Sequence, residues 1–242
     1  MELNDSIKSQ LIESGQKINV EVIESLNQFY KNHYIRTLEI QKYDSRNLIG
    51  KNIIVFVQNN LFRFKSIVEG YVIGLNNNNP LCSVILLRTL YETTGALAFF
   101  HKKYEQYKGN SLPEEEFKIV LNKLFLGSKS QEVENAIEPY NVMKLIDATD
   151  YFLKKITGSN EKRFRLGYDR LSEISHPNNY GYFLGSEIKQ DLSAVHFTDE
   201  TKLFPLKYYY FEYFALITEI YKMIYKDIIK HREDLPYIVL KR

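Results

Sequence analysis

The hydrophobic positions of this chain recur mostly at the three- and four-residue spacing of an amphipathic helix. Such a repeat predicts helix, because the side chains then fall on one face of a turn of about 3.6 residues. The first stretch of this kind covers residues 5–45 and places apolar side chains at Ile18, Val22, Leu26, Phe29 and Leu38. Further helices are predicted over 47–75, 81–105, 138–157, 160–175 and 207–231.

Turn-forming residues separate these helices. "NNNNP" is a break, because asparagine favours turns and Pro80 suits the first turn of a helix. Ser111 is a candidate N-cap and Pro113 a candidate first-turn residue of a short helix that "GSKS" ends. Residues 177–205 are rich in loop formers, and "GYFLG" and "AVHFT" predict a small β-hairpin near 181–198.

No internal repeat and no long low-complexity linker divides the chain. A chain of 242 residues is long enough to bury most of its apolar surface without disulfides or a metal ion. The predicted fold class is therefore all-α: one multi-helix bundle over residues 1–242, with the small hairpin as an addition.

The composition is that of an ordinary globular protein, with 44% hydrophobic and 26% charged residues. The net charge of +2 is too small to indicate nucleic-acid binding by itself. Cys82 is the only cysteine, which excludes a disulfide framework, and its apolar neighbours predict that it is buried. The N-terminus does not read as a signal peptide and no apolar run reaches membrane-spanning length, so we expect a cytoplasmic location and no membrane partner.

The sequence predicts neither a metal site nor a cofactor. His33, His101, His196 and His231 are scattered without the spacing of metal ligands. A glycine-rich phosphate loop is also missing, because "GSKS" lacks the required spacing and "GYFLG" lacks a strand–helix context.

The helix predicted over 81–105 is apolar nearly all round, which is typical of a helix at the centre of a bundle. It nevertheless carries Arg88 and Glu92, four residues apart on one face, and Gly95 continues the same stripe, so another backbone can approach there. One interpretation is an internal salt bridge that fixes helix packing. The other is a cleft in which this pair orients a catalytic group from another helix.

The helix predicted over 160–175 is clearly amphipathic. Its core face is predicted to hold Phe164, Tyr168, Leu171 and Ile174. Its polar face gathers basic, acidic and hydroxyl side chains, and Arg170 lies at the border. The polar face comprises Lys162, Arg165, Asp169, Ser172, Glu173 and His176.

The end of this helix brings His176 into a basic neighbourhood. Pro177 disfavours the α conformation of the residue before it, so His176 is predicted to leave the helical path and turn towards Arg170. Residues 154–170 hold six basic and two acidic residues. A charge run of this kind is either a solvated face or a surface for phosphate.

The spacing Arg170-x5-His176 resembles the R-x4-6-H motif of the HEPN superfamily. "RTLYETT" and "SEISHP" are also similar to an uncharacterised bacterial branch of such helical proteins. Many HEPN domains are helical bundles that act as metal-independent ribonucleases in toxin–antitoxin, abortive-infection and CRISPR-linked defence. Their motif lies near the end of a late helix and often works across a dimer, so the resemblance implies RNA as substrate, a homodimer and a protein antitoxin as partner.

The resemblance implies a role for each residue of the site. Arg170 would grip a phosphodiester and His176 would exchange a proton with the ribose 2′-hydroxyl or the leaving oxygen. Asp169, Ser172 and Glu173, with Arg88 and Glu92, would support the pair. Phosphate binding would fall to Lys162 and Arg165.

Other interpretations remain open from the sequence. The residue after the motif arginine is usually polar in active members, but here it is Leu171, which also fits a catalytically inactive module that binds a nucleotide or a protein. A further interpretation is that His176 only caps the helix by hydrogen-bonding local backbone. A third possibility is a purely structural dimer whose polar stripe serves packing. The aromatic run "KYYYFEYF" indicates either core packing or a dimer interface.

Overall fold

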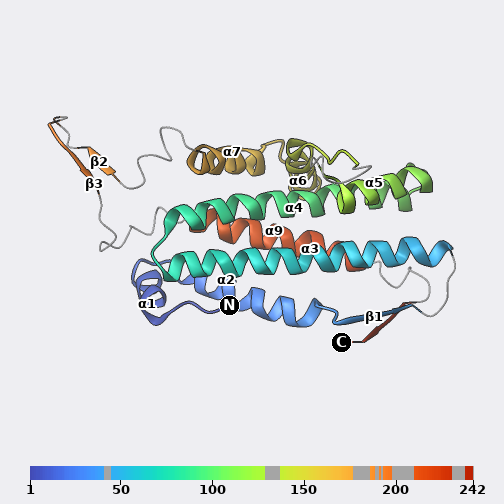
Figure 1. Ribbon diagram of the computed structural model, residues 1–242, viewed down its shortest axis with the longest axis horizontal. Helices are drawn as coiled ribbons and strands as arrows, with labels where there is room; N and C mark the ends of the chain where they lie inside the picture. The colour runs from blue at the N-terminus through green and yellow to red at the C-terminus, as the bar shows by residue number, and fades with distance from the viewer. Residues whose placement is uncertain are drawn as a thin grey trace.

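The computed structural model describes residues 1–40, 45–128, 137–176, 186–188, 191, 193–197, 210–230 and 238–241. Over these residues the chain is an all-α bundle of several long helices, as predicted (Figure 1). None of the helices in this part of the chain combines the length and the apolar character needed to cross a membrane. The described helices are α1 (Asp5–Glu13), α2 (Lys17–His33), α3 (Ser45–Asn76), α4 (Pro80–Lys108), α5 (Glu114–Leu126), α6 (Val142–Thr157), α7 (Arg163–Ser175) and α9 (Phe211–Lys230).

Helix α4 is the central element of the bundle. It contacts α3, α5, α6, α7 and α9, which explains why its sequence is apolar nearly all round. Figure 1 shows α3 and α4 side by side along the long axis, with α6 and α7 on one side of α4 and with α1 and α2 beyond α3. The prediction that this helix lies at the centre of a bundle is therefore confirmed.

The turn between α3 and α4 follows from the asparagine run. Asn78 adopts a left-handed backbone with φ 52°, a conformation that asparagine tolerates better than most residues. Asn79 caps α4 by accepting a hydrogen bond from the Cys82 backbone at 2.9 Å, and Pro80 occupies the first turn. Cys82 itself is only half-buried, because it lies one turn from the end of the helix rather than in the core.

The N-terminal prediction needs correction. The apolar repeat over 5–45 is not one helix: α1 ends at Glu13, Ser14 is its C-cap residue and Gly15 follows with φ 75°. Helix α2 ends at His33, the backbone of the next residue Tyr34 is extended, and Leu38 belongs to strand β1 (Thr37–Ile40). Strand β1 pairs antiparallel with β4 (Ile238–Lys241), and that distant partner selects the strand conformation.

The predicted β-hairpin is present in the described residues. Strand β2 (Ser186–Ile188) pairs antiparallel with β3 (Val195–Phe197). The second strand falls in "AVHFT" as predicted, whereas the first begins after "GYFLG", which itself lies outside the described residues. Both strands lie beyond the C-terminal end of α7 (Figure 1).

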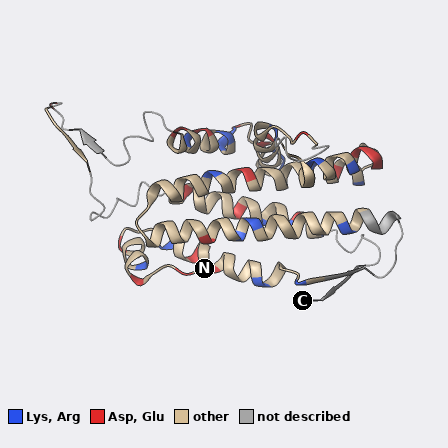
Figure 2. Cartoon of the chain, viewed as in Figure 1, with Lys and Arg blue, Asp and Glu red and all other residues tan. Residues whose placement is uncertain are grey.

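Helix α5 begins later than its predicted cap. Pro113, not Ser111, is the residue at its N-terminal boundary, and the Ser111 hydroxyl instead donates to the Gln106 carbonyl at the end of α4. The first turn of α5 holds Glu114, Glu115 and Glu116, seen as an acidic tip in Figure 2. These carboxylates favour the positive end of the helix dipole.

The core is rich in buried aromatic side chains and forms one hydrophobic cluster from Leu3 to Ile228. Phe64 of α3 stacks on Tyr221 of α9 with ring centroids 3.7 Å apart. Phe211 and Phe214 are also fully buried, so the described part of the aromatic run serves the core. Residues 207–209, where the last helix was predicted to start, lie outside the described residues.

Candidate functional site

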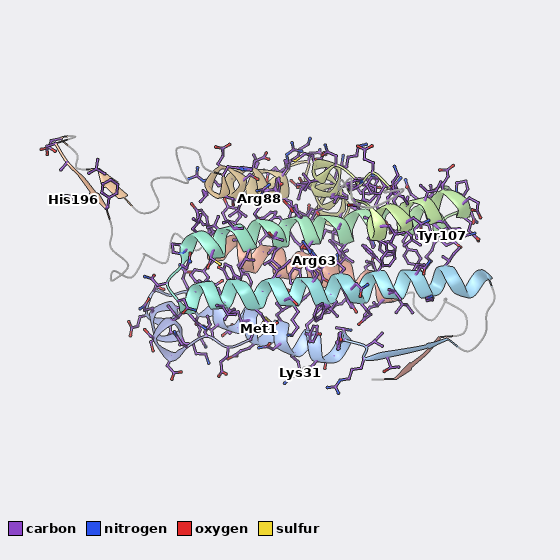
Figure 3. All side chains as sticks on the ribbon, viewed as in Figure 1. Met1, Lys31, Arg63, Arg88, Tyr107 and His196 are labelled. Carbon is purple, nitrogen blue, oxygen red and sulfur yellow. The ribbon has the colours of Figure 1, made fainter. Side chains whose placement is uncertain are left out.

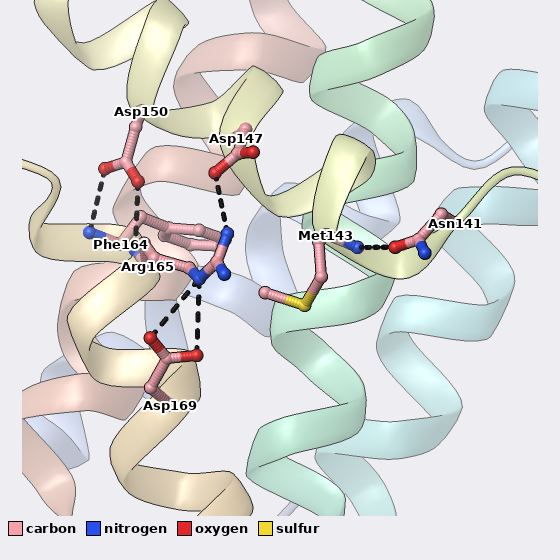
Figure 4. A network of polar contacts seen from close by, with 7 residues as sticks. All are labelled: Asn141, Met143, Asp147, Asp150, Phe164, Arg165 and Asp169. Atoms are coloured by element: carbon pink, nitrogen blue, oxygen red, sulfur yellow. Dashed lines mark hydrogen bonds and ion pairs between the residues drawn. The ribbon is translucent and has the colours of Figure 1, made fainter.

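The site is built on α7, whose N-terminus is capped from the preceding helix. Lys162 occupies the N-cap position but makes no capping bond with its side chain. The side chain of Asp150 in α6 provides the cap instead. Its two carboxylate oxygens accept hydrogen bonds from the backbone nitrogens of Phe164 and Arg165, each at 3.0 Å (Figure 4). An acidic group at this end of a helix satisfies free N–H groups and favours the dipole. Asp150 thus ties α7 to α6.

The pKa of Asp150 lies above its ordinary value because the carboxyl is buried. The two backbone hydrogen bonds act in the opposite direction, as does the nearby Lys162, whereas Asp147 raises the pKa further. Burial therefore outweighs the hydrogen bonds at this cap, since removing a carboxylate from water disfavours its charged form.

Arg165 lies between two carboxylates. Its Nη1 donates to Asp147 at 3.0 Å, and its Nε lies 3.3 Å from both oxygens of Asp169 (Figure 4). The positive charge of Arg165 is thereby balanced, as is much of the charge on Asp169. Lys162, the other residue predicted to bind phosphate, is exposed. Figure 2 shows acidic and basic positions mixed along the ribbons of α6 and α7.

The two faces of α7 agree with the helical-wheel prediction. Phe164, Tyr168, Leu171 and Ile174 are buried. Asp169, Arg170, Glu173 and His176 are exposed. Ser172 is half-buried, and its Oγ atom is fully buried without a hydrogen-bond partner among the described residues, so this hydroxyl points away from solvent.

Tyr168 connects α7 to the charged pair of α4. The Arg88 guanidinium donates to the Tyr168 hydroxyl at 3.2 Å, and that hydroxyl donates to Glu92 at 3.1 Å. Arg88 Nε also lies 3.6 Å from Glu92, and the guanidinium carbon lies 5.4 Å from the centre of the Tyr168 ring. Figure 3 shows Arg88 in the layer between α4 and α7. We call this set the α4–α7 network: Arg88, Glu92 and Tyr168.

The α4–α7 network has features of both an internal salt bridge and the wall of a cleft, the two interpretations of the charged pair Arg88 and Glu92. Its side chains are partly exposed, 26% for Arg88 and 33% for Glu92, so they are not sealed in the core. Arg88 Nε is nevertheless buried and lacks a hydrogen-bond partner among the described residues. Glu92 also lines a pocket of about 420 Å³. The pocket lies between α3, α4, α5 and α6 and is lined by Phe56, Asn59, Asn60, Arg63, Glu92, Thr93, Ala96, Leu124, Phe125 and Leu145.

His176 ends α7 in the conformation predicted from Pro177. Its backbone is extended, with φ −85° and ψ 150°, and its N–H donates to the Ser172 carbonyl at 3.1 Å. The side chain is therefore exposed just past the last helical turn. Pro177 itself lies outside the described residues.

Arg170 is exposed on the same helix, one to two turns before His176. Its guanidinium donates a hydrogen bond to the Tyr210 hydroxyl, just before α9. Burial raises the pKa of Tyr210, and Arg170 acts against this rise. Among the described residues no hydrogen bond or ion pair joins Arg170 directly to His176. The structure thus places both on one helix end without joining them.

Three residues of this region were missed by the sequence reasoning. Tyr168 was assigned to the core, yet its hydroxyl bridges Arg88 and Glu92. Asp150 caps α7 and Tyr210 contacts Arg170, and in both cases the partners lie far apart in the sequence. The sequence offers one signal, and it concerns Tyr168. A tyrosine on a core face that otherwise holds residues such as phenylalanine and leucine has a hydroxyl that needs a hydrogen-bond partner when it is buried.

Comparisons of the chain with protein-family models, with curated proteins and with solved structures found no match. What the site does must therefore be argued from its own geometry. Three features of the structure bear on function: the exposed pair at the end of α7, the α4–α7 network and the pocket that shares Glu92.

Proposed function

We propose that this chain is a HEPN-like, metal-independent RNA endonuclease whose reacting groups are Arg170 and His176. The main support is that both side chains are exposed at the end of α7, where His176 has left the helical path. A polyanion can reach this corner without unfolding any described helix. The resemblance of Arg170-x5-His176 to the R-x4-6-H motif gives the chemistry.

In the proposed reaction Arg170 binds the scissile phosphate. A guanidinium can donate two parallel hydrogen bonds to phosphate oxygens and stabilise the charge that develops on them. His176 takes the proton of the ribose 2′-hydroxyl as its oxygen bonds to phosphorus. The bond from phosphorus to the 5′-oxygen then breaks, and the imidazolium or water returns a proton to that oxygen. The products are a 2′,3′-cyclic phosphate and a 5′-hydroxyl.

The neighbouring residues have supporting roles in this proposal. Lys162 attracts the RNA backbone, whereas Arg165 is held by two carboxylates and contributes less. Glu173 and Asp169 face the same solvent as Arg170 and orient it or the substrate. The α4–α7 network positions α7, because Tyr168 fixes the core side of the helix that displays Arg170 and His176. The Ser172 hydroxyl is buried without a partner among the described residues, so the structure adds no contact that supports its predicted role.

We propose a homodimer as the working form and a protein antitoxin as its regulator, as in the toxin and defence systems of the HEPN superfamily. Pairing two copies would bring two Arg170 and His176 pairs onto one RNA strand. The molar mass measured by light scattering tests the dimer, and co-purification with the product of an adjacent gene tests the antitoxin.

The decisive experiment is cleavage of total RNA by the purified chain in EDTA. We expect Arg170→Ala and His176→Ala each to lower the rate by a factor of about 10² to 10⁴, the usual contribution of one proton-transfer or charge-stabilising group. Arg163→Ala and His196→Ala are matched controls, since Arg163 is another exposed arginine of α7 and His196 an exposed histidine of β3. Circular dichroism confirms that each variant is folded.

Cleavage that survives both substitutions, or that needs Mg²⁺, would overturn this assignment. Failure of the folded wild-type chain to cut RNA would favour the second candidate function, a catalytically inactive binding module. The pocket of about 420 Å³ supports that candidate, because its size is typical of small-ligand sites. Phe56 and Phe125 offer aromatic walls to a base, and Arg63 offers a guanidinium to a phosphate. Equilibrium dialysis against nucleoside monophosphates, with Arg63→Ala as the comparison, tests it.

A further inference from the structure

A second polar cluster lies in the other half of α4. His101 of α4 is buried with 3% of its surface exposed, and its Nε2 lies 2.7 Å from Asp227 of α9. Its Nδ1 lies 3.8 Å from Glu105, one turn further along α4. One ligand atom from each residue can be chosen so that all three lie within 4.8 Å of one another. We call these residues, His101, Glu105 and Asp227, the His101 cluster.

The His101 cluster is fixed on one side and open on the other. The imidazole is held by the core, with the Phe152 ring edge-on at 5.3 Å between centroids. The carboxylate side chains are partly exposed, 38% for Glu105 and 43% for Asp227. An ion can therefore reach the cluster from solvent, and the carboxylates can turn towards it without disturbing the core.

The cluster already attracts a cation. Lys155 of α6 places its ammonium nitrogen 2.6 Å from Glu105 Oε1. This hydrogen bond raises the pKa of Lys155, and the charges of Glu105 and Asp227 act in the same direction. The two carboxylates of the cluster thus face the single ammonium of Lys155 at the surface of the bundle.

We propose that His101, Glu105 and Asp227 bind a divalent first-row transition ion, with Zn²⁺ as the best fit. One imidazole nitrogen and two carboxylate oxygens are an ordinary Zn²⁺ ligand set, whereas Mg²⁺ and Ca²⁺ prefer oxygen ligands alone. In a tetrahedral site with bonds of about 2.0–2.1 Å the ligand atoms lie about 3.3 Å apart. The two exposed carboxylates reach this spacing by small rotations, in which Glu105 releases Lys155. The fourth position is left for water.

This site is separate from the proposed RNA site and does not rest on it. Arg88 and His101 lie about 20 Å apart along α4, from a rise of about 1.5 Å per residue. An ion at the His101 cluster would join α4 to α9 beside the end of α6, so its effect is on the bundle and not on the corner of α7. A chain that does not cut RNA would therefore not contradict the ion site. A chain that binds no Zn²⁺ would not contradict the RNA site.

The His101 cluster was not predicted from the sequence, because only the spacing between histidines was considered there. His101 and Glu105 are four residues apart, a spacing that places both side chains on one face of a helix. That spacing was the available signal. Asp227 comes from a distant helix, and only the packing of α9 on α4 brings it to His101.

The test is isothermal titration of the full-length, EDTA-treated and desalted chain with Zn²⁺. We expect one ion to bind per chain, with affinity lowered at least about tenfold in Glu105→Gln and in Asp227→Asn. Lys155→Met removes the competing ammonium, and we expect it to tighten binding by a few-fold, the usual strength of an exposed ion pair. His196→Ala, which removes an exposed histidine elsewhere, should leave the affinity unchanged.

Cobalt substitution gives a second readout that does not depend on heat signals. Co²⁺ should give visible absorption bands typical of four-coordination in the wild-type chain, and these bands should be lost in Asp227→Asn. Absence of saturable Zn²⁺ binding would overturn the proposal. Wild-type affinity in both Glu105→Gln and Asp227→Asn would also overturn it, since the ion would then be bound elsewhere.

Discussion

At the scale of single residues, hydroxyl and carboxyl groups hold α7 in place. The Tyr168 hydroxyl accepts a hydrogen bond from Arg88 and donates its only proton to Glu92. Asp150 uses both carboxylate oxygens at the other end of the helix. Tyr168 and Asp150 are both buried residues, so these protein contacts replace most of their contacts with water.

Replacement of Tyr168 by phenylalanine should destabilise the fold. Tyr168→Phe keeps the ring over the Arg88 guanidinium but leaves Arg88 and Glu92 without their shared partner. Because Arg88 and Glu92 are partly exposed, water can solvate them in the variant, and we expect a loss of about 0.5–1.5 kcal/mol in the free energy of unfolding, the usual contribution of a hydrogen bond. Urea denaturation measures this loss, and Tyr151→Phe, at an exposed tyrosine of α6, is the control that should change little. A Tyr168→Phe variant as stable as the wild type would show that the network is not structural.

Asp150 should make stability depend on pH in a specific direction. Since folding holds its pKa above the ordinary value of 3.8, the folded chain binds this proton more tightly than the unfolded chain. The free energy of unfolding should therefore fall as pH rises from 3.8 through the raised pKa. Asp150→Asn lacks the titrating carboxyl group. Its free energy of unfolding relative to that of the wild type should therefore increase with pH across that window. A difference between the two chains that is constant or decreases over the same window would refute the assignment.

At the scale of elements, the close approach of α4 and α6 depends on Gly95. A Cβ atom built at Gly95 would lie 2.9 Å from the Leu145 carbonyl carbon, which is backbone and cannot move aside. The stripe Arg88, Glu92 and Gly95 thus carries both the polar network and the contact with the helix that supplies Asp150. This is the approach of a second backbone that the sequence predicted.

Gly95→Ala should separate α4 from α6 and destabilise the bundle by about 1–3 kcal/mol, the usual cost of overpacking. Gly70→Ala is the matched control in a helix. A Cβ atom there would meet only the Leu86 side chain, at 3.0 Å, and alanine raises helix propensity. In thermal denaturation, the Tm of Gly95→Ala should lie clearly below the Tm of Gly70→Ala. An equal effect of the two substitutions would mean that the contact with Leu145 is loose.

The elements were predictable where local rules decide them. The faces of α7, the cap of α4 by Asn79 and the exit of His176 from the helix follow from periodicity and turn chemistry within a few residues. The predictions for Leu38 and for the bridging hydroxyl of Tyr168 were wrong or incomplete for one shared reason. Their conformation and role depend on partners far along the chain, which helical periodicity does not encode.

At the scale of the whole molecule, α4 organises two polar regions on one apolar helix. Its N-terminal half carries the α4–α7 network under the exposed end of α7, and its C-terminal half carries the His101 cluster. A buried helix tolerates such groups only where each has partners on the neighbouring helices. The proposed RNA chemistry and the proposed ion site thus use opposite ends of the same scaffold.

The central claim is that the end of α7 cuts RNA by attack of the 2′-hydroxyl. Its most direct measurement is the end-group chemistry of RNA fragments formed by the purified chain in EDTA. We predict 2′,3′-cyclic phosphate ends, an uncut substrate when the ribose at the cleavage site is 2′-deoxy, and loss of both fragments and ends in His176→Ala but not in His196→Ala. Fragments with 3′-hydroxyl ends, or the same products from His176→Ala at the wild-type rate, would contradict the account.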